Sequence, residues 1–254
     1  MSFIGDKDFL LEVAKGNITG HTITNKFGRN PDIDAASSFE AIWNGGGDYR
    51  GFDATTGALL DIWSSSTADD AGAGGARTME IQGLSSAWVE QTETITLNGT
   101  AIVNSTNKYL RMHRAKVLSA GSSNTNQGNI VATQTGATAI QFMSMPVGYN
   151  QTMIAAFTIP ADKKGYIVNW YASNSNRKDT DNDIRLVARP PSETFQVKEE
   201  FSLHHDGTSY IHRDYAAPKG AFTSKTDIKV MAQSTVNDTA ISAGFDIVVV
   251  SCAT

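Results

Sequence analysis

Residues 92–103 read TETITLNGTAIV, and this stretch indicates the fold class of the chain. Its apolar residues Ile95 and Leu97 alternate with threonines, which is the period-two pattern of a strand with one buried face. The Asn98-Gly99 pair that follows is a strong signal for a two-residue β-turn. We therefore expect the stretch to form a β-hairpin.

Strand-like runs of the same kind recur on both sides of this stretch. They are separated by turn residues roughly every 8–14 positions and add up to roughly a dozen short strands with almost no helix. The pattern predicts an all-β protein with an antiparallel β-sandwich or jelly-roll body. The PVGYN run at 146–150 has the composition of a joint between domains. The predicted domains are an extended N-terminal arm at 1–52, a β subdomain at 53–147 and the sandwich or jelly-roll domain at 148–254.

Composition limits the function classes that the chain can serve. The 254 residues are 40% hydrophobic and 19% charged, with a formal net charge of −5, which argues against a general nucleic-acid binder. The longest apolar run, IVVV at 247–250, is far shorter than a membrane span requires, and the N-terminus lacks the apolar core of a signal peptide. We expect a soluble protein made in a cytoplasm. Cys252 is the single cysteine, so it forms no intrachain disulfide, and we interpret it as a packing residue.

Motifs that would carry chemistry are few. The GAGGAR run at 72–77 lacks the Lys-Ser/Thr of a phosphate loop and reads as a flexible turn. The HRAKVL region, with Arg111, Arg114 and Lys116, is interpreted as a solvated strand face, with contact to an acidic partner as the alternative. No nucleophile elbow or pair of facing carboxylates is present, so we expect no catalytic residues, no cofactor and no enzyme activity.

Three other groups leave a binding role open. Alternating aspartates could form a loose cation site or only an acidic turn, and the histidines could bind a metal or lie near a symmetry axis. The tryptophans could line a sugar site, although aromatic residues in β proteins more often serve as core or interface anchors. The residues concerned are Asp179, Asp181 and Asp183; His204, His205 and His212; and Trp43, Trp63, Trp88 and Trp170.

The run GRNPDIDAASSFEAIWNGGGDYRGF at 28–52 resembles the N-terminal part of a family of virion structural proteins of tailed phages, often marine phages. The runs SSSTADDAGAGGARTMEIQGL, NQTMIAAFTIPADKKGYI and ISAGFDIVVV fit the same family, and the resemblance covers most of residues 26–250. It implies a protein located in the virion after synthesis in the host cytoplasm.

The resemblance also implies a role and partners. We expect a non-enzymatic capsid decoration or cement protein that bridges subunits of the major capsid protein, as a homo-oligomer, with a trimer favoured. We expect no direct contact with nucleic acid or membrane. The alternative is a tail, neck or fibre-type component that contacts host glycans.

Large apolar residues in the irregular segment 1–52 need a packing partner. They could anchor the arm on a neighbouring subunit or on the capsid shell, or the arm could fold back and cap its own β body. The predicted partner-binding residues are Phe27, Arg29, Ile33, Phe39, Ile42, Trp43, Tyr49 and Phe52.

Overall fold

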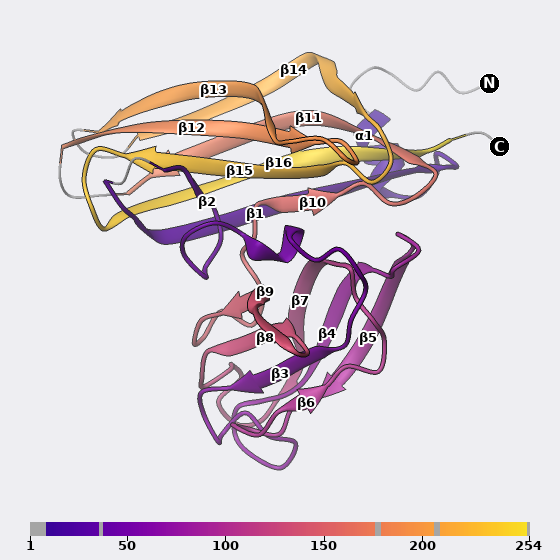
Figure 1. Cartoon of the computed structure of the whole chain (residues 1–254), viewed down its shortest axis with the longest axis vertical. Coiled ribbons are helices and arrows are strands. Elements are labelled where there is room, and N and C mark those ends of the chain that lie inside the picture. Colours follow the sequence, from indigo (N-terminus) through magenta and orange to yellow (C-terminus); the bar gives the residue numbers. More distant parts are fainter. Residues whose placement is uncertain (1–8, 36–37, 176–178, 206–208, 253–254) are drawn as a thin grey trace.

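The computed structural model describes residues 9–35, 38–175, 179–205 and 209–252. Within these ranges the chain forms one α-helix, α1 (Phe9–Ala14), one 3-10 helix, η1 (Arg50–Phe52), and sixteen strands. The strands form two β units, one drawn above the other in Figure 1. The prediction of an all-β fold is confirmed.

The larger unit consists of two antiparallel sheets that share one hydrophobic core, and it is called the sandwich below. The first sheet has the order β1-β16-β11-β14, and the second has the order β10-β15-β12-β13 with β2 added beside β15 (Figure 1). The strands of the first sheet are β1 (His21–Ile33), β16 (Thr239–Ser251), β11 (Lys163–Asn174) and β14 (Ser209–Phe222). Those of the second are β10 (Ala156–Thr158), β15 (Asp227–Ser234), β12 (Thr180–Arg189), β13 (Gln196–His205) and β2 (Glu40–Ala41).

The strand pairs of the sandwich are nested along the sequence. The outermost pair is β1 with β16, followed inward by β10 with β15, β11 with β14 and β12 with β13, all antiparallel. The eight strands therefore pair as a long hairpin would. Two further antiparallel pairings, β11 with β16 and β12 with β15, join these four strand pairs into the two sheets.

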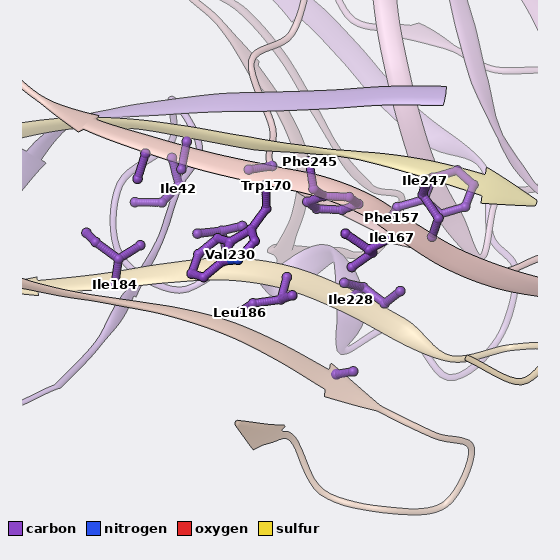
Figure 2. Packing of buried hydrophobic residues seen from close by; sticks show 14 of the residues in the cluster. Ile42, Phe157, Ile167, Trp170, Ile184, Leu186, Ile228, Val230, Phe245 and Ile247 are labelled. Carbon is purple, nitrogen blue, oxygen red and sulfur yellow. The ribbon is translucent and has the colours of Figure 1, made fainter. Parts of the chain in front are cut away.

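The main hydrophobic core lies between the two sheets of the sandwich. Alternate residues of each strand point inward, as the pleat of a strand requires. Figure 2 shows the two sets of side chains facing one another: Ile167, Trp170 and Phe245 from the first sheet, and Ile184, Leu186 and Val230 from the second. Each of these side chains is fully buried, so each contributes roughly 1.5–3 kcal/mol of hydrophobic stabilisation.

The smaller unit is inserted between β2 and β10. One of its sheets has the order β6-β3-β8-β9, the other has the order β5-β4-β7, and the two share a second core. The strands are β3 (Leu60–Ser64), β4 (Ala76–Leu84), β5 (Glu90–Thr96), β6 (Val103–Asn104), β7 (Arg111–Ala120), β8 (Ile130–Gln134) and β9 (Ala137–Met145). This unit falls within the predicted subdomain at 53–147.

Two local predictions are wrong. Residues 21–33 of the predicted arm form β1, which pairs along its length with β16 inside the sandwich. The Asn98-Gly99 turn does not close a hairpin, because β5 before it pairs with β4 whereas β6 after it pairs with β3. β1 has its partner near the other end of the chain, and β6 pairs with β3, beyond β4 and β5, so local pattern gives no information about either pairing.

A buried aspartate organises the loops of the smaller unit. Asp69 is fully buried, and its Oδ1 accepts the backbone N–H groups of Ala76 and Gln127, each at 2.8 Å. Its Oδ2 accepts the backbone N–H of Gly128 at 2.8 Å and the Ser64 hydroxyl at 2.6 Å. One carboxylate therefore ties its own loop, at Ser64 and Ala76, to the distant loop at Gln127 and Gly128.

The glycine-rich run at 72–77 is part of this arrangement and is not the flexible turn that we predicted. A Cβ on Gly75 would lie 2.3 Å from Oδ1 of Asp69, so only glycine fits beside the carboxylate. Gly121 packs as closely on the carbonyl oxygen of Ala73, where a Cβ would lie 2.3 Å away. Close packing at Gly75 and Gly121 therefore holds the backbone of residues 72–77 in place.

Replacing Asp69 with alanine is expected to lower the free energy of unfolding by about 3 kcal/mol, because buried N–H donors lose a charged acceptor. Asp70→Ala is the matched control: the neighbouring carboxylate accepts the backbone N–H of Gly72, and its loss should cost less than about 1 kcal/mol. Urea unfolding of both variants measures the difference. Equal losses would contradict the role assigned to Asp69.

Candidate functional site

The aromatic residues of segment 39–52 form a third hydrophobic cluster. Trp43 and Tyr49 meet edge to face with ring centroids 5.2 Å apart, and Tyr49 meets Phe52 in the same way at 5.1 Å. Phe195 stacks on Phe52 at 6.0 Å. The Tyr49 hydroxyl donates to the carbonyl oxygen of Phe142 in the smaller unit at 3.2 Å, and burial raises the pKa of this hydroxyl. The cluster therefore packs the segment onto the chain's own body and links its two units.

This packing matches the second alternative for the aromatic segment, in which the arm folds back on its own β body. Five of the predicted partner-binding residues are at most 3% exposed, so they offer no surface to another molecule: Ile33, Ile42, Trp43, Tyr49 and Phe52. Phe27 and Phe39 are half-buried beneath the guanidinium groups of Arg114 and Arg185. Arg29 lies 3.5 Å from the Tyr149 hydroxyl. The segment folds back on its own β body, and the structure does not bring these residues together as an outward-facing site.

A buried ion-pair network joins the two units beside this cluster. Arg111 of β7 makes a bidentate pair with Asp227 of β15, through contacts of 2.9 and 3.0 Å. Arg189 contacts the same carboxylate at 2.7 Å, and the Thr158 hydroxyl donates to it at 2.6 Å. The remaining Nη1 of Arg111 donates to the carbonyl oxygen of Ala54 at 2.8 Å. Every group of this network has a partner, so its role is to lock the two units together.

The network corrects our interpretation of the HRAKVL region. Arg111 is only 5% exposed, so the predicted solvated strand face is wrong at this position. Arg114 is half-buried and donates to the Asn25 carbonyl oxygen at 2.7 Å. Lys116 pairs with Glu80 at 3.1 Å and matches the prediction of a solvated charge.

Lys26 and His113 are buried basic residues that the sequence analysis missed. Lys26 is 2% exposed, and its amine donates to the backbone carbonyl oxygen of His113. Burial and the nearby charge of Arg114 lower the Lys26 pKa to about 7. Burial also holds the pKa of the His113 imidazole well below its usual value. A lysine at an inward position of a strand was a possible signal, but β1 had not been predicted as a strand.

The depressed Lys26 pKa should make stability depend on pH. An unfolded lysine has a pKa of about 10.4, so between pH 7 and 9 the unfolded chain binds a proton that the folded chain has released. The free energy of unfolding should therefore rise with pH across this window, by up to about 1.4 kcal/mol per pH unit from this group. Lys26→Met should flatten the rise and should be more stable than the wild type at pH 6.

Urea unfolding of the two proteins at pH 6, 7, 8 and 9 tests this prediction. Lys229, whose pKa burial also lowers, is present in both proteins and cancels in the comparison. An unchanged slope in Lys26→Met would show that Lys26 is charged in the folded chain throughout the window.

An apolar groove lies on the outer face of the first sandwich sheet. It has a volume of about 620 Å³ and runs between α1 and strands β11, β14 and β16. Its lining includes Phe9, Leu10, Tyr166, Val168 and Val248. Phe9 and Leu10 are about 40% exposed, which is unusual for large apolar side chains.

The predicted ion ligands are brought together only in part. Asp181 and His204 are cross-strand neighbours on β12 and β13, with Oδ1 and Nδ1 2.7 Å apart, and Asp179 lies 3.5 Å from the other ring nitrogen of His204. Asp183 instead accepts a hydrogen bond from Ser202. His212 lies on β14 in the other sheet, and the side chain of His205 lies outside the described residues. Among the residues that the structure describes, no group of three ligands is arranged to hold a metal ion.

The remaining candidates are scattered over the molecule. Trp170 fills the sandwich core, Trp88 lies over Arg111 with 4.9 Å between ring centroid and guanidinium carbon, and Trp63 is half-buried on β3. With Trp43 in the third cluster, the four tryptophans do not share one site. Cys252 is exposed, so its predicted packing role is wrong.

Comparisons with known proteins give little further information. No protein-family model matches the chain, and no curated protein matches it. One solved structure, described as that of the infectious bursal disease virus Gt strain, aligns with 91% of this chain and 73% of its own at 10% identity and a TM-score of 0.27. A second, the infectious bursal disease virus VP2 subviral particle, aligns with 92% and 73% at 10% identity and a TM-score of 0.24. Overlap this weak does not establish a shared fold.

Within the described part of the chain, no helix has the length and hydrophobicity to cross a lipid bilayer.

Proposed function

We propose that this chain is a non-enzymatic virion structural protein of a tailed phage that decorates the capsid. In this role it bridges subunits of the major capsid protein and assembles as a homo-oligomer, for which a trimer is the first expectation. The observation that carries the proposal is the strand order of the sandwich, together with the sequence resemblance of residues 28–52.

The strand order supports our proposal that the larger unit is a jelly roll. Numbered 1 to 8 in chain order, the strands β1 and β10–β16 have the orders 1-8-3-6 and 2-7-4-5 in the two sheets. This is what results when a long hairpin with pairs 1-8, 2-7, 3-6 and 4-5 is rolled up. Double-sheet jelly rolls of eight strands are used by viral capsid proteins, lectins and cupins. The fold therefore suits a virion role without being specific to it.

The buried charged residues support a structural role. Asp69, Asp227 and Arg111 are occupied by hydrogen bonds and ion pairs that connect segments of the chain to each other. Lys229 pairs with Asp48. These contacts give the two units the rigidity that a bridging protein needs.

The surface that would dock on the capsid is the apolar groove beside α1. Large exposed apolar patches on a folded protein mark interaction sites, and Phe9 and Leu10 of the groove are exposed, as is Leu11 beside them on α1. This surface takes the place of the arm residues that we first expected to act as anchors. An interface of standard size would bury about 1,600 Å² in total.

Cryo-EM of the particle, reconstructed with and without icosahedral symmetry, tests the proposal. Density of this chain on the shell between capsomers is the expected result. Density restricted to the unique vertex would overturn the decoration role in favour of a tail, neck or fibre position.

Leu10→Asp is expected to lower occupancy on the shell at least tenfold, because a charge in the groove cannot be buried without a partner. Val197→Asp is the matched control, since Val197 is an exposed apolar residue on β13, outside the groove. Full occupancy of Leu10→Asp would show that this groove is not the docking surface.

A further inference from the structure

A half-open cavity lies between the sandwich and the smaller unit, separate from the apolar groove. Its volume is about 530 Å³, within the range of small-ligand pockets. One wall is β1, from Ile23 to Phe27, and the other comes from β4, β5 and β7 of the smaller unit. The cavity therefore opens at the junction of the two units.

Basic side chains dominate the charge of this cavity. Lys26, His113 and Arg114 all line it. Glu90 is the one carboxylate among the lining residues, and it pairs with Lys163 at 2.5 Å. The cavity therefore has an excess of positive charge whenever Lys26 is protonated.

Lys26, which is buried, and Arg114, which is half-buried, differ from the cations Arg111 and Lys229 in lacking a carboxylate partner. Arg111 is paired with Asp227, and Lys229 with Asp48. Within the described ranges no carboxylate lies within ion-pair distance of Lys26 or Arg114, and the acceptors recorded for them are backbone carbonyl oxygens. An ammonium has three donors and a guanidinium five, so both retain unused N–H groups. Buried cations in proteins are normally compensated by an anion.

We propose that this cavity binds a small oxyanion, a carboxylate, sulfate or phosphate, between Lys26 of the sandwich and Arg114 of the smaller unit. The anion supplies the counter-charge that the chain itself does not provide. Gln82, Gln91 and Thr92, which also line the cavity, offer neutral hydrogen-bonding groups to the rest of the ligand. Lys26 is only 2% exposed and its amine is bonded to the His113 carbonyl oxygen, so the amine has to turn into the cavity to meet the anion, and a small ligand fits this site better than a side chain of another protein.

Binding at this position would tighten the junction. The two cations come from different units, so an anion held by both adds a bridge to the Arg111–Asp227 network. A ligand that binds only the folded chain raises its stability in proportion to the logarithm of ligand concentration once the site is occupied. The site does not depend on the proposed place of the protein in the virion.

Isothermal titration calorimetry of the full chain at pH 6, where Lys26 carries its proton, tests the proposal with sodium acetate, sulfate and phosphate as probes. We expect saturable binding of at least one of the three anions, and no binding with chloride at equal ionic strength. Any two of the anions that bind should compete with each other. Lys26→Met and Arg114→Gln should each raise the dissociation constant at least tenfold. Lys116→Gln, on the same strand but exposed and paired with Glu80, should leave it unchanged.

Thermal unfolding in the same salts gives a second readout. Sulfate and phosphate stabilise many proteins without binding, so the informative quantity is the difference in Tm shift between the wild type and Lys26→Met. A wild type with no saturable heat and no excess Tm shift in any of the three salts would overturn the proposal. An equal response of wild type and Lys26→Met would overturn it as well, and this variant should fold because it loses a buried charge.

Discussion

Asp227→Ala is expected to lower the free energy of unfolding by about 3–5 kcal/mol, because it leaves a buried arginine without its counter-charge. Arg111 is 5% exposed and Asp227 is 2% exposed, so water cannot replace the lost carboxylate at the bidentate contact. Arg189 and the Thr158 hydroxyl lose the same acceptor. The loss should appear in urea unfolding followed by tryptophan fluorescence.

The matched control is Glu200→Ala. Glu200 pairs with Arg185 on neighbouring strands, but both side chains are about one-third exposed or more. Exposed ion pairs contribute at most about 1 kcal/mol, so this variant should remain close to the wild type. If Asp227→Ala loses no more than Glu200→Ala does, the two units are not held together by this network.

A pair of apolar substitutions separates the effect of the buried charges on stability from the effect of packing. Replacing Arg111 with methionine and Asp227 with leucine together removes the buried charges and keeps apolar volume at the junction. Such replacements of buried ion pairs are often neutral or stabilising, so the double variant should be less destabilised than Asp227→Ala alone.

The all-β fold could be predicted because its signal is local. The alternation of Met79 and Ile81 with polar residues is enough to indicate a strand, and both residues are fully buried in the second core. Strands β4, β5 and β7 each overlap a run with a strand-like pattern, at 77–84, 92–103 and 108–118. What the pattern could not supply was pairing, since the partner of β5 lies before it in the chain and that of β6 lies earlier still.

The strand β1 was missed because its inward positions are polar. Lys26 and Asn30 are buried, and their hydrogen-bond partners are the His113 carbonyl oxygen and the Glu40 carboxylate. One partner is 87 residues away, so nothing near β1 in the sequence indicates that a lysine could be buried there. The cavity beside Lys26 was hidden for the same reason, because it exists only where two distant segments meet.

The aromatic segment was misjudged for a different reason. Large apolar residues without a strand or helix period were interpreted as anchors for another molecule, but the two β units of this chain form a junction that needs filling. Trp43 lies on the glycine run that follows it: its Nε1 donates to the Gly46 carbonyl oxygen at 3.0 Å, and a Cβ on Gly45 would lie 2.2 Å from the indole ring. The three glycines after Asn44 therefore let the backbone of this segment cover the Trp43 ring.

Trp43→Ala tests this core role through its effect on the free energy of unfolding. Removing a buried tryptophan leaves a cavity and should cost about 3–5 kcal/mol of unfolding free energy. Tyr49 loses its edge-to-face partner in the same variant. Tyr210→Ala is the control, because this ring is 61% exposed and its loss should change stability by no more than about 0.5 kcal/mol.

The decisive comparison is between stability and incorporation into the particle. If Trp43 is a core residue, the fraction of folded Trp43→Ala protein that joins the shell should match the wild type once both are adjusted for the amount folded. A variant that keeps its unfolding free energy within about 1 kcal/mol of the wild type but no longer joins the particle would contradict the core role. That outcome would require segment 39–52 to leave the junction on assembly, with the third cluster re-forming against the partner.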